Sequence, residues 1–111
     1  LKLETIFAER VNGKLLLRRG FKIKQNSNVL IVEDVITTGK SALECANIVK
    51  MSKANLIGYA CIIDRSTENA YIKDSIVSQM QFNIETFPKE KIPGDLSEIE
   101  PVKPGSKNLS K

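Results

Sequence analysis

The spacing of apolar residues divides the chain into strands and a helix. Residues 29–32 form a continuous apolar run rich in β-branched side chains, and residues 56–63 form a longer run interrupted by Gly58; both are typical of strands buried on both faces of a parallel sheet. Between them the apolar period becomes helical from about Lys40 or Ser41. This strand–helix–strand order predicts an α/β fold with a central, largely parallel sheet and flanking helices. The helix should bury one stripe: Ala42, Leu43, Ala46, Ile48 and Val49.

Weaker patterns lie on either side of this unit. Two β-rich segments, residues 3–10 and 14–18, are joined through Asn12-Gly13, a pair that tolerates positive φ and predicts an N-terminal β-hairpin. Residues 76–80 fit a short helix or a strand, and residues 82–87 fit a later strand. All four prolines follow residue 87, so we expect a core over residues 1–87 and an irregular tail over residues 88–111.

Composition limits the chemistry available. The 111 residues suit one domain, and the sequence holds no histidine, which excludes Ser-His-Asp catalysis, Cys-His catalysis and histidine-ligated metal sites within this chain. Of the net charge of +4, residues 1–26 carry +5. Such a basic segment attracts polyanions, and the scarcity of aromatic residues among its bases favours a small phosphate ester over nucleic acid.

The cysteines and the apolar runs indicate the compartment. Cys45 and Cys61 lack the spacing of a disulfide framework, so we expect buried free thiols in a reducing environment. The longest apolar run, residues 56–63, is too short to span a membrane, and no signal peptide opens the chain, so a cytoplasmic protein is expected. The first residue is Leu1 and not Met, which suggests an incomplete or processed protein.

The candidate site follows the first apolar run. Glu33 and Asp34 come first, then Thr37-Thr38-Gly39, then the start of the helix. Parallel strands deliver their carboxyl ends to the crevice where α/β proteins bind ligands, and a helix N-terminus presents free N–H groups that favour phosphate. Glycine lets the backbone approach a phosphate closely, and the neighbouring hydroxyl groups add donors.

The acidic pair indicates what the phosphate is attached to. Carboxylates that faced the phosphate itself would repel it, whereas sugar hydroxyls are natural partners for carboxylate acceptors. A ligand with vicinal hydroxyls and a nearby phosphate is a ribose 5-phosphate. The same carboxylates can stabilise positive charge on the sugar ring in an oxocarbenium-like transition state.

Two other interpretations of this segment compete. Gly39-Lys40-Ser41 matches the end of a P-loop, but that motif needs its first glycine at position 34, where Asp34 stands. In the other, the acids are a solvated strand end and Thr38 or Gly39 is only a helix cap. The uninterrupted order of strand, two acids, two hydroxyls, glycine and helix favours the phosphate site over both.

The central segment, residues 32–39, closely resembles the phosphoribosyl-pyrophosphate (PRPP) motif of type I phosphoribosyltransferases. Its flanks are similar to orotate phosphoribosyltransferases, and the resemblance runs from about Ile6 to Ser106. The flanking segments that carry it are Phe7-Ala8-Glu9-Arg10, Leu17-Arg18-Arg19-Gly20-Phe21, Ile63-Asp64-Arg65 and Val102-Lys103-Pro104-Gly105-Ser106.

The resemblance implies a partial type I phosphoribosyltransferase fold and a homodimeric enzyme. The reaction would transfer phosphoribosyl from PRPP to orotate, giving orotidine 5′-phosphate and pyrophosphate in UMP biosynthesis. Mg²⁺ would be bound mainly through substrate oxygens, without a dedicated protein metal site. Glu33 and Asp34 would be catalytic and contact the ribose, and Thr37 and Arg65 would contact orotate. The PRPP-binding segment would comprise Glu33, Asp34, Val35, Ile36, Thr37, Thr38, Gly39, Lys40 and Ser41.

Some features depart from the family pattern. Lys40 stands where small residues are usual, the histidine of the mobile catalytic loop is absent, and the N-terminal hood, early strands and pyrophosphate loop are missing, so this fragment could lack full activity. On the residues alone, Arg65 could equally be a surface residue paired with Asp64 or Glu68. Two alternatives stay open: a regulator of the same fold that senses a nucleotide and binds RNA or DNA, and a transferase for another base such as a purine.

Overall fold

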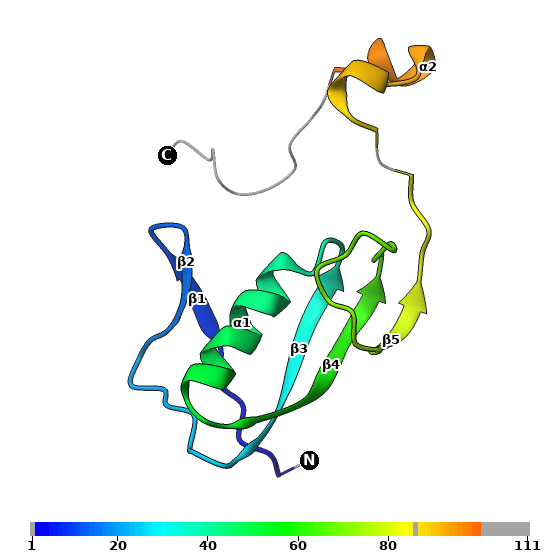
Figure 1. Ribbon diagram of the computed structural model, residues 1–111. Coiled ribbons are helices and arrows are strands. Elements are labelled where there is room, and N and C mark those ends of the chain that lie inside the picture. Colours follow the sequence, from blue (N-terminus) through cyan, green and yellow to red (C-terminus); the bar gives the residue numbers. More distant parts are fainter. Residues whose placement is uncertain (1, 86, 101–111) are drawn as a thin grey trace.

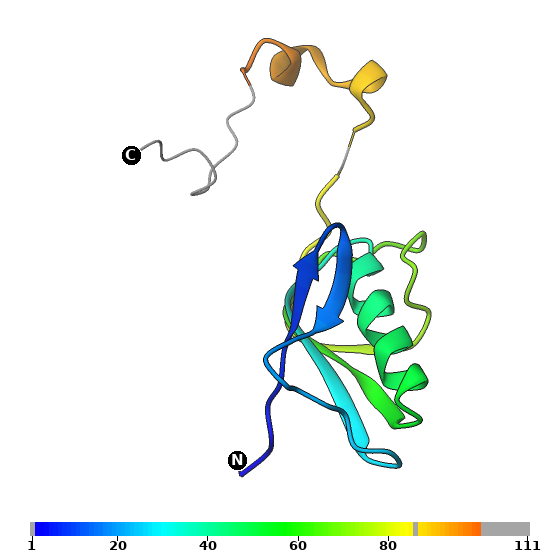
Figure 2. The same cartoon turned by 90° about the vertical axis from the view of Figure 1, so that its left-hand side faces the viewer.

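The computed structural model describes residues 2–85 and 87–100, and its centre is a parallel sheet covered by one helix (Figure 1). Strands β3 (Asn28–Ile36), β4 (Asn55–Asp64) and β5 (Ile76–Gln81) are parallel and adjacent in that order. Helix α1 (Lys40–Met51) connects β3 to β4 and lies across one face of the sheet (Figures 1 and 2). The predicted α/β fold is confirmed, with α1 as the flanking helix in the described part of the chain.

The predicted N-terminal hairpin is also present. Strands β1 (Ala8–Val11) and β2 (Lys14–Leu17) pair antiparallel through a turn in which Asn12 and Gly13 both have positive φ, 49° and 81°. The hairpin forms a separate two-stranded sheet and lies beside α1 (Figure 2). A T-shaped contact between Phe7 and Phe21, with ring centroids 5.0 Å apart, joins its two ends.

The C-terminal part differs from the sequence expectation. Residues 76–81 form a strand, whereas residues 82–85 and 87 are not extended partners of any sheet, so the later strand over residues 82–87 is wrong where the structure describes it. Two short helices, η1 (Lys89–Lys91) and α2 (Gly94–Ser97), interrupt the expected irregular tail. The described part of this tail, residues 88–100, lies away from the sheet (Figure 1). Residues 101–111, including Pro101, Pro104 and the resembling segment at 102–106, lie outside the described residues. The boundary at residue 87 stays a prediction.

The core lies between α1 and the sheet. It combines Ala42 and Val49 of α1 with residues of β3 and β4 and with Ile72 from the β4–β5 connection. Leu43 is wrong as a core residue, because it is 36% exposed on the outer side of α1. Cys45 is half-buried and Cys61 buried, both as free thiols, as expected, and burial raises the pKa of each. Among the described residues, no helix has the length and apolar character needed to cross a membrane.

The opposite face of the sheet is uncovered. Alternation along the strands places the exposed residues Leu30 and Val32 of β3, Ile62 of β4 and Val77 of β5 on this face, while their neighbours Ile31 and Cys61 face the core. Burial of the strands on both faces, as the apolar runs predict, is therefore not found within the described residues.

Candidate functional site

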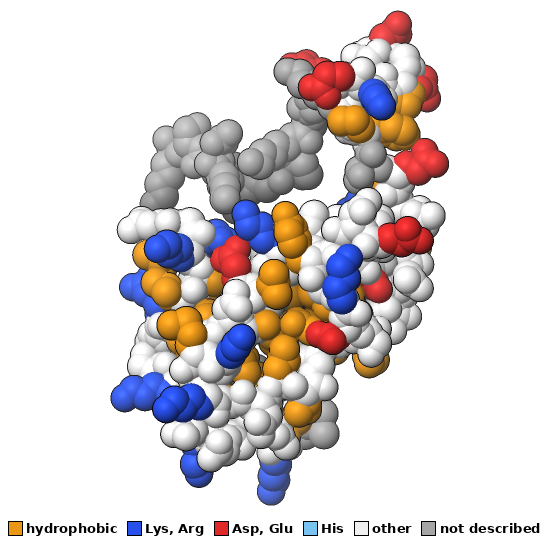
Figure 3. Space-filling model, viewed as in Figure 1, with side chains coloured by type: hydrophobic (Ala, Val, Ile, Leu, Met, Phe, Trp, Pro, Cys, Tyr) orange, Lys and Arg blue, Asp and Glu red, His pale blue; other side chains and the backbone are white. Residues whose placement is uncertain are grey.

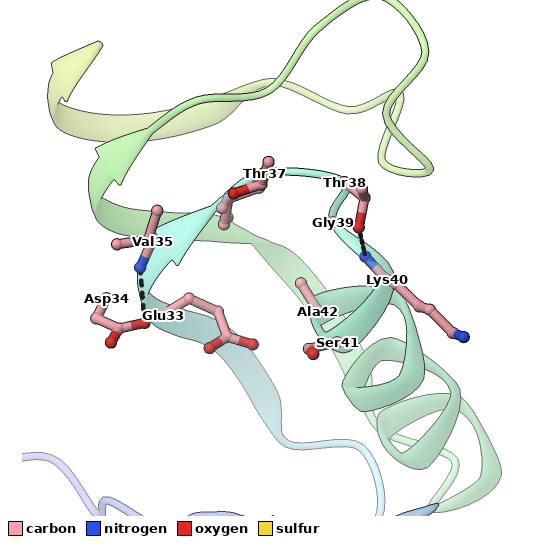
Figure 4. A pocket seen from close by; sticks show the side chains of 10 residues that line it. Glu33, Asp34, Val35, Thr37, Thr38, Gly39, Lys40, Ser41 and Ala42 are labelled. Atoms are coloured by element: carbon pink, nitrogen blue, oxygen red, sulfur yellow. Dashed lines mark hydrogen bonds between the residues drawn. The ribbon is translucent and has the colours of Figure 1, made fainter. Parts of the chain in front are cut away.

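A cavity of about 270 Å³ opens where β3 ends and α1 begins (Figure 4). Its lining contains every residue of the predicted PRPP-binding segment, Glu33 to Ser41, together with Ala42. Strand β3 extends to Ile36, four residues beyond the predicted run, so the two acids lie within the strand and not after it. The cavity is therefore formed by the end of β3, the three-residue loop 37–39 and the first turn of α1.

The loop between β3 and α1 is held by one main-chain hydrogen bond to the β4–β5 connection and by one hydrogen bond within the loop. The Tyr71 N–H donates to the Thr38 carbonyl at 2.8 Å, and the Lys40 N–H lies 3.4 Å from Thr38 Oγ1. Gly39 follows with φ 73°, and a Cβ at this position would lie 2.9 Å from Ile72 Cγ1. Glycine is needed here for its left-handed backbone and for the packing of Ile72, as well as for the approach of a ligand predicted from the sequence.

The first turn of α1 supplies amide donors to the cavity. The first hydrogen bond of the helix runs from the Leu43 N–H to the Gly39 carbonyl at 2.9 Å. The preceding N–H groups, including those of Ser41 and Ala42, therefore have no acceptor within the helix, and they carry the positive end of its dipole. Because both residues line the cavity, this end of the helix is suited to an anion such as a phosphate.

The two acids point in different directions. In Figure 4 the Glu33 carboxylate is directed toward Ser41, on the side of α1, whereas Asp34 turns away from the helix. Asp34 Oδ1 accepts the Val35 N–H at 2.7 Å, and its second oxygen accepts no hydrogen bond from the part of the chain that the structure describes. Partial burial, followed by repulsion from Asp34, raises the pKa of Glu33. The two carboxylates can therefore meet different groups of one ligand.

The unusual lysine of the loop is not directed at the cavity. The Lys40 side chain is exposed and extends away from the space between Glu33 and Ser41 (Figure 4). Its backbone lines the cavity, but its ammonium group neither crowds the space nor reaches into it in this conformation. A small side chain at this position is thus not required by the shape of the loop.

Arg65 lies next to the cavity but does not line it. Its N–H donates to the Ile36 carbonyl at 2.8 Å, so it follows the end of β4 directly beside Thr37. The ion pairs among the described residues join arginines 10, 18 and 19 to Glu9 and Glu44, and the alternative pairing of Arg65 with Asp64 or Glu68 is not formed. The Arg65 Nε atom is buried without a hydrogen-bond acceptor within the described chain.

Sequence reasoning missed three residues near the site. Arg10 of β1 donates from Nη1 to Glu44 at 3.1 Å and from Nη2 to Ser41 Oγ at 3.4 Å, so the hairpin touches the cavity lining. Basic side chains gather over the hairpin in the space-filling view (Figure 3). Tyr71 and Ile72 support the loop from the β4–β5 connection. No local sequence pattern predicts these contacts, because each joins segments about thirty residues apart.

Two solved structures resemble part of this fold. Adenine phosphoribosyltransferase from Leishmania tarentolae matches with a TM-score of 0.48 and 24% identity, over 60% of this chain and 36% of that protein. Adenine phosphoribosyltransferase from Leishmania donovani matches with a TM-score of 0.48 and 27% identity, over 60% of this chain and 33% of that protein.

Curated relatives match almost the whole sequence. An orotate phosphoribosyltransferase from Thermoanaerobacter sp. (strain X514) is 44% identical over 106 residues, and one from Maricaulis maris (strain MCS10) is 34% identical over 108 residues. These matches cover 96% and 97% of this chain but 56% of each relative, so the chain spans about half the length of the curated relatives it matches. The phosphoribosyl transferase domain family matches residues 4–91. The chain belongs to the phosphoribosyl transferase domain family.

Proposed function

We propose that the protein transfers the phosphoribosyl group of PRPP to orotate, producing orotidine 5′-phosphate and pyrophosphate for UMP synthesis. The observation that carries the proposal is the cavity at the start of α1, which all the predicted PRPP-binding residues line. Orotate is favoured over a purine as the acceptor because the matching curated relatives are orotate phosphoribosyltransferases. The proposal includes a homodimer, as the resemblance implies, and a cytoplasmic location, which the two free cysteines favour.

Each part of the cavity has a role in this reaction. The free amides of Ser41 and Ala42 would hold the 5-phosphate, with the Thr38 hydroxyl beside them. Glu33 and Asp34 would accept hydrogen bonds from the ribose hydroxyls. The bond from C1 of the ribose to pyrophosphate breaks, the bond from C1 to N1 of orotate forms, and the proton of N1 passes to the released pyrophosphate or to water. The negative potential of the two carboxylates favours the positive charge that develops on the sugar ring between these events.

Thr37 and Arg65 would hold the base. Thr37 lines the cavity, and Arg65 is anchored through its N–H to the residue before Thr37. A guanidinium that has no acidic partner in the described chain is available to a planar carboxylate, which it can bind through two parallel hydrogen bonds. Orotate carries such a carboxylate, whereas the common purines do not.

The donor set of the cavity fits a Mg²⁺ held chiefly by its substrate. Among the described residues, no three or more His, Cys, Asp or Glu side chains are grouped as a metal site. Glu33 and Asp34 offer hard carboxylate oxygens at the cavity, and Mg²⁺ in phosphate sites is usually bound by one or two carboxylates together with phosphate oxygens. When bound, Mg²⁺ would offset the negative charge of the pyrophosphate group.

Asp34→Asn tests the assignment of the ribose site. A charge-assisted hydrogen bond is worth about 1.5–3 kcal/mol, so we expect the affinity for PRPP to fall by roughly one to two orders of magnitude, with a matching loss of transfer rate. Calorimetric titration with PRPP and release of pyrophosphate measure the two effects. Asp95→Asn, on an exposed residue of α2, is the matched control. Wild-type affinity in the Asp34 variant would refute the assignment.

The acceptor is tested separately by offering orotate, adenine and hypoxanthine to the wild-type protein with PRPP and Mg²⁺. Turnover of orotate alone supports the proposal, and turnover of a purine replaces it with transfer to that base. Retention of a labelled RNA or DNA duplex without any turnover would instead support a regulator built on the same fold.

A further inference from the structure

Asp64 is the charged residue that the sheet buries. It closes β4, it is 6% exposed, and no other polar or charged side chain among the described residues is buried to this degree. A carboxylate removed from water is costly unless it accepts hydrogen bonds. Its Oδ1 accepts a hydrogen bond from the Ser66 N–H at 2.8 Å, and this hydrogen bond bridges the residue between them, Arg65. The carboxylate of Asp64 therefore braces the backbone of the residue assigned to the base.

Two further hydrogen bonds fix this turn. The Arg65 N–H donates to the Ile36 carbonyl at 2.8 Å, and the Asp64 carbonyl accepts the Phe82 N–H at 2.9 Å. These bonds tie the end of β4 to β3 on one side and to the segment after β5 on the other. Both involve the main chain alone. The bond from Asp64 Oδ1 is the contribution of a side chain, so it is the one that a substitution can remove.

We propose that Asp64 is a positioning residue that orients Arg65 toward the carboxylate of the acceptor base, an inference that rests on the proposed function. Loss of the Ser66 bond would remove the restraint on the chain that follows Arg65, so the guanidinium would no longer be held in one direction toward the base. The phosphate end of the site, at α1, would be unaffected because it shares no hydrogen bond with this turn. The role depends on an acceptor oxygen carried on a side chain with a single methylene group, as in Asp or Asn, and not on negative charge.

A pair of variants separates geometry from charge. Asp64→Asn removes the charge but keeps Oδ1 in place, so the KM for orotate should stay within about threefold of the wild type. Asp64→Glu keeps the charge but displaces its oxygens from the Ser66 N–H, so the KM for orotate should rise about three- to tenfold, as expected for the loss of one ordinary hydrogen bond. Asp64→Ala should match Asp64→Glu. In each variant the KM for PRPP should change less than twofold.

The opposite pattern, with loss in Asp64→Asn and wild-type behaviour in Asp64→Glu, would overturn the proposal, as would equal changes of KM for both substrates. If Asp64→Ala and Asp64→Glu fail to fold, Asp64→Asn still decides, because a tenfold rise in its KM for orotate contradicts a geometric role. Arg65→Ala, measured in parallel, separates failure of the proposed base site from failure of the proposed role of Asp64. No effect of Arg65→Ala on orotate would refute the assignment of the base site itself, whereas loss there with none in Asp64→Glu and Asp64→Ala would refute only the role of Asp64.

Discussion

Substitution of Gly39 by alanine should destabilise the fold through two separable effects. Gly39 has φ 73°, a left-handed conformation that costs an alanine about 1–2 kcal/mol. The new Cβ would also lie 2.9 Å from Ile72 Cγ1 and 3.0 Å from Ile72 Cδ1, closer than carbon atoms pack. Forcing a methyl group into a filled site typically costs about 1–3 kcal/mol. Together the two effects predict a loss of about 2–5 kcal/mol in the free energy of unfolding.

Gly20→Ala isolates the first effect. Gly20 has φ 78°, but a Cβ there would meet no heavy atom within 4 Å, so this variant should lose only the conformational share, about 1–2 kcal/mol. Urea unfolding followed by circular dichroism measures both variants. A double-mutant cycle with Ile72→Ala should then recover a coupling free energy of about 1–3 kcal/mol between positions 39 and 72. Equal losses in the two glycine variants, or a coupling below about 0.5 kcal/mol, would refute the packing argument.

Two further substitutions test the core and the acidic pair. Ile36→Ala removes the largest side chain that is fully buried among the described residues, and it should lower the free energy of unfolding in urea by about 2–5 kcal/mol. Val32→Ala, at a position 67% exposed on the same strand, should change it by less than about 0.5 kcal/mol. Similar losses in both variants would contradict the described core. Glu33→Gln tests the raised pKa of Glu33. The folded state binds the proton of Glu33 more tightly than the unfolded state does. The wild type therefore loses stability relative to Glu33→Gln as the pH rises from the ordinary carboxyl range through the raised pKa. Below that range the two proteins should be equally stable. Unfolding midpoints measured between pH 3 and pH 8, with Glu4→Gln as an exposed control, check this sign, and a difference that does not vary with pH would contradict it.

The sequence predicted the elements whose signals are local. Asn12-Gly13 specified the hairpin turn because both residues tolerate positive φ, and the change from β-branched runs to a helical period located the start of α1 within one residue. The apolar pattern predicts β3 too short because it ends at the charged residues Glu33 and Asp34, whereas a strand can carry charged residues where one edge and one face meet solvent. Leu43 was misplaced because the apolar period alone does not show which side of a helix lacks a partner.

The supports of the site could not be predicted in the same way. The requirement for glycine at position 39 arises partly from Ile72, which approaches it only after the β4–β5 connection folds back over the loop. Arg10 reaches Ser41 only because the hairpin docks against α1. The buried state of Asp64 depends on the strands on both sides of β4, which are distant in sequence. Such contacts depend on how the strands and the helix are arranged in space, and that arrangement results from many weak interactions along the whole chain.

The uncovered sheet face has a consequence for any sample of this chain. Strand β3 is at the edge of its sheet in the described structure, and Leu30 and Val32 are exposed beside its unpaired backbone groups. Apolar edge strands of this kind recruit other copies as the concentration rises, and charged residues are the usual deterrent. Asp34 continues the same face by alternation, so we expect the acid proposed to contact the ribose also to oppose pairing of this edge with other copies. A neutral residue at this position should therefore lower the concentration at which the protein precipitates.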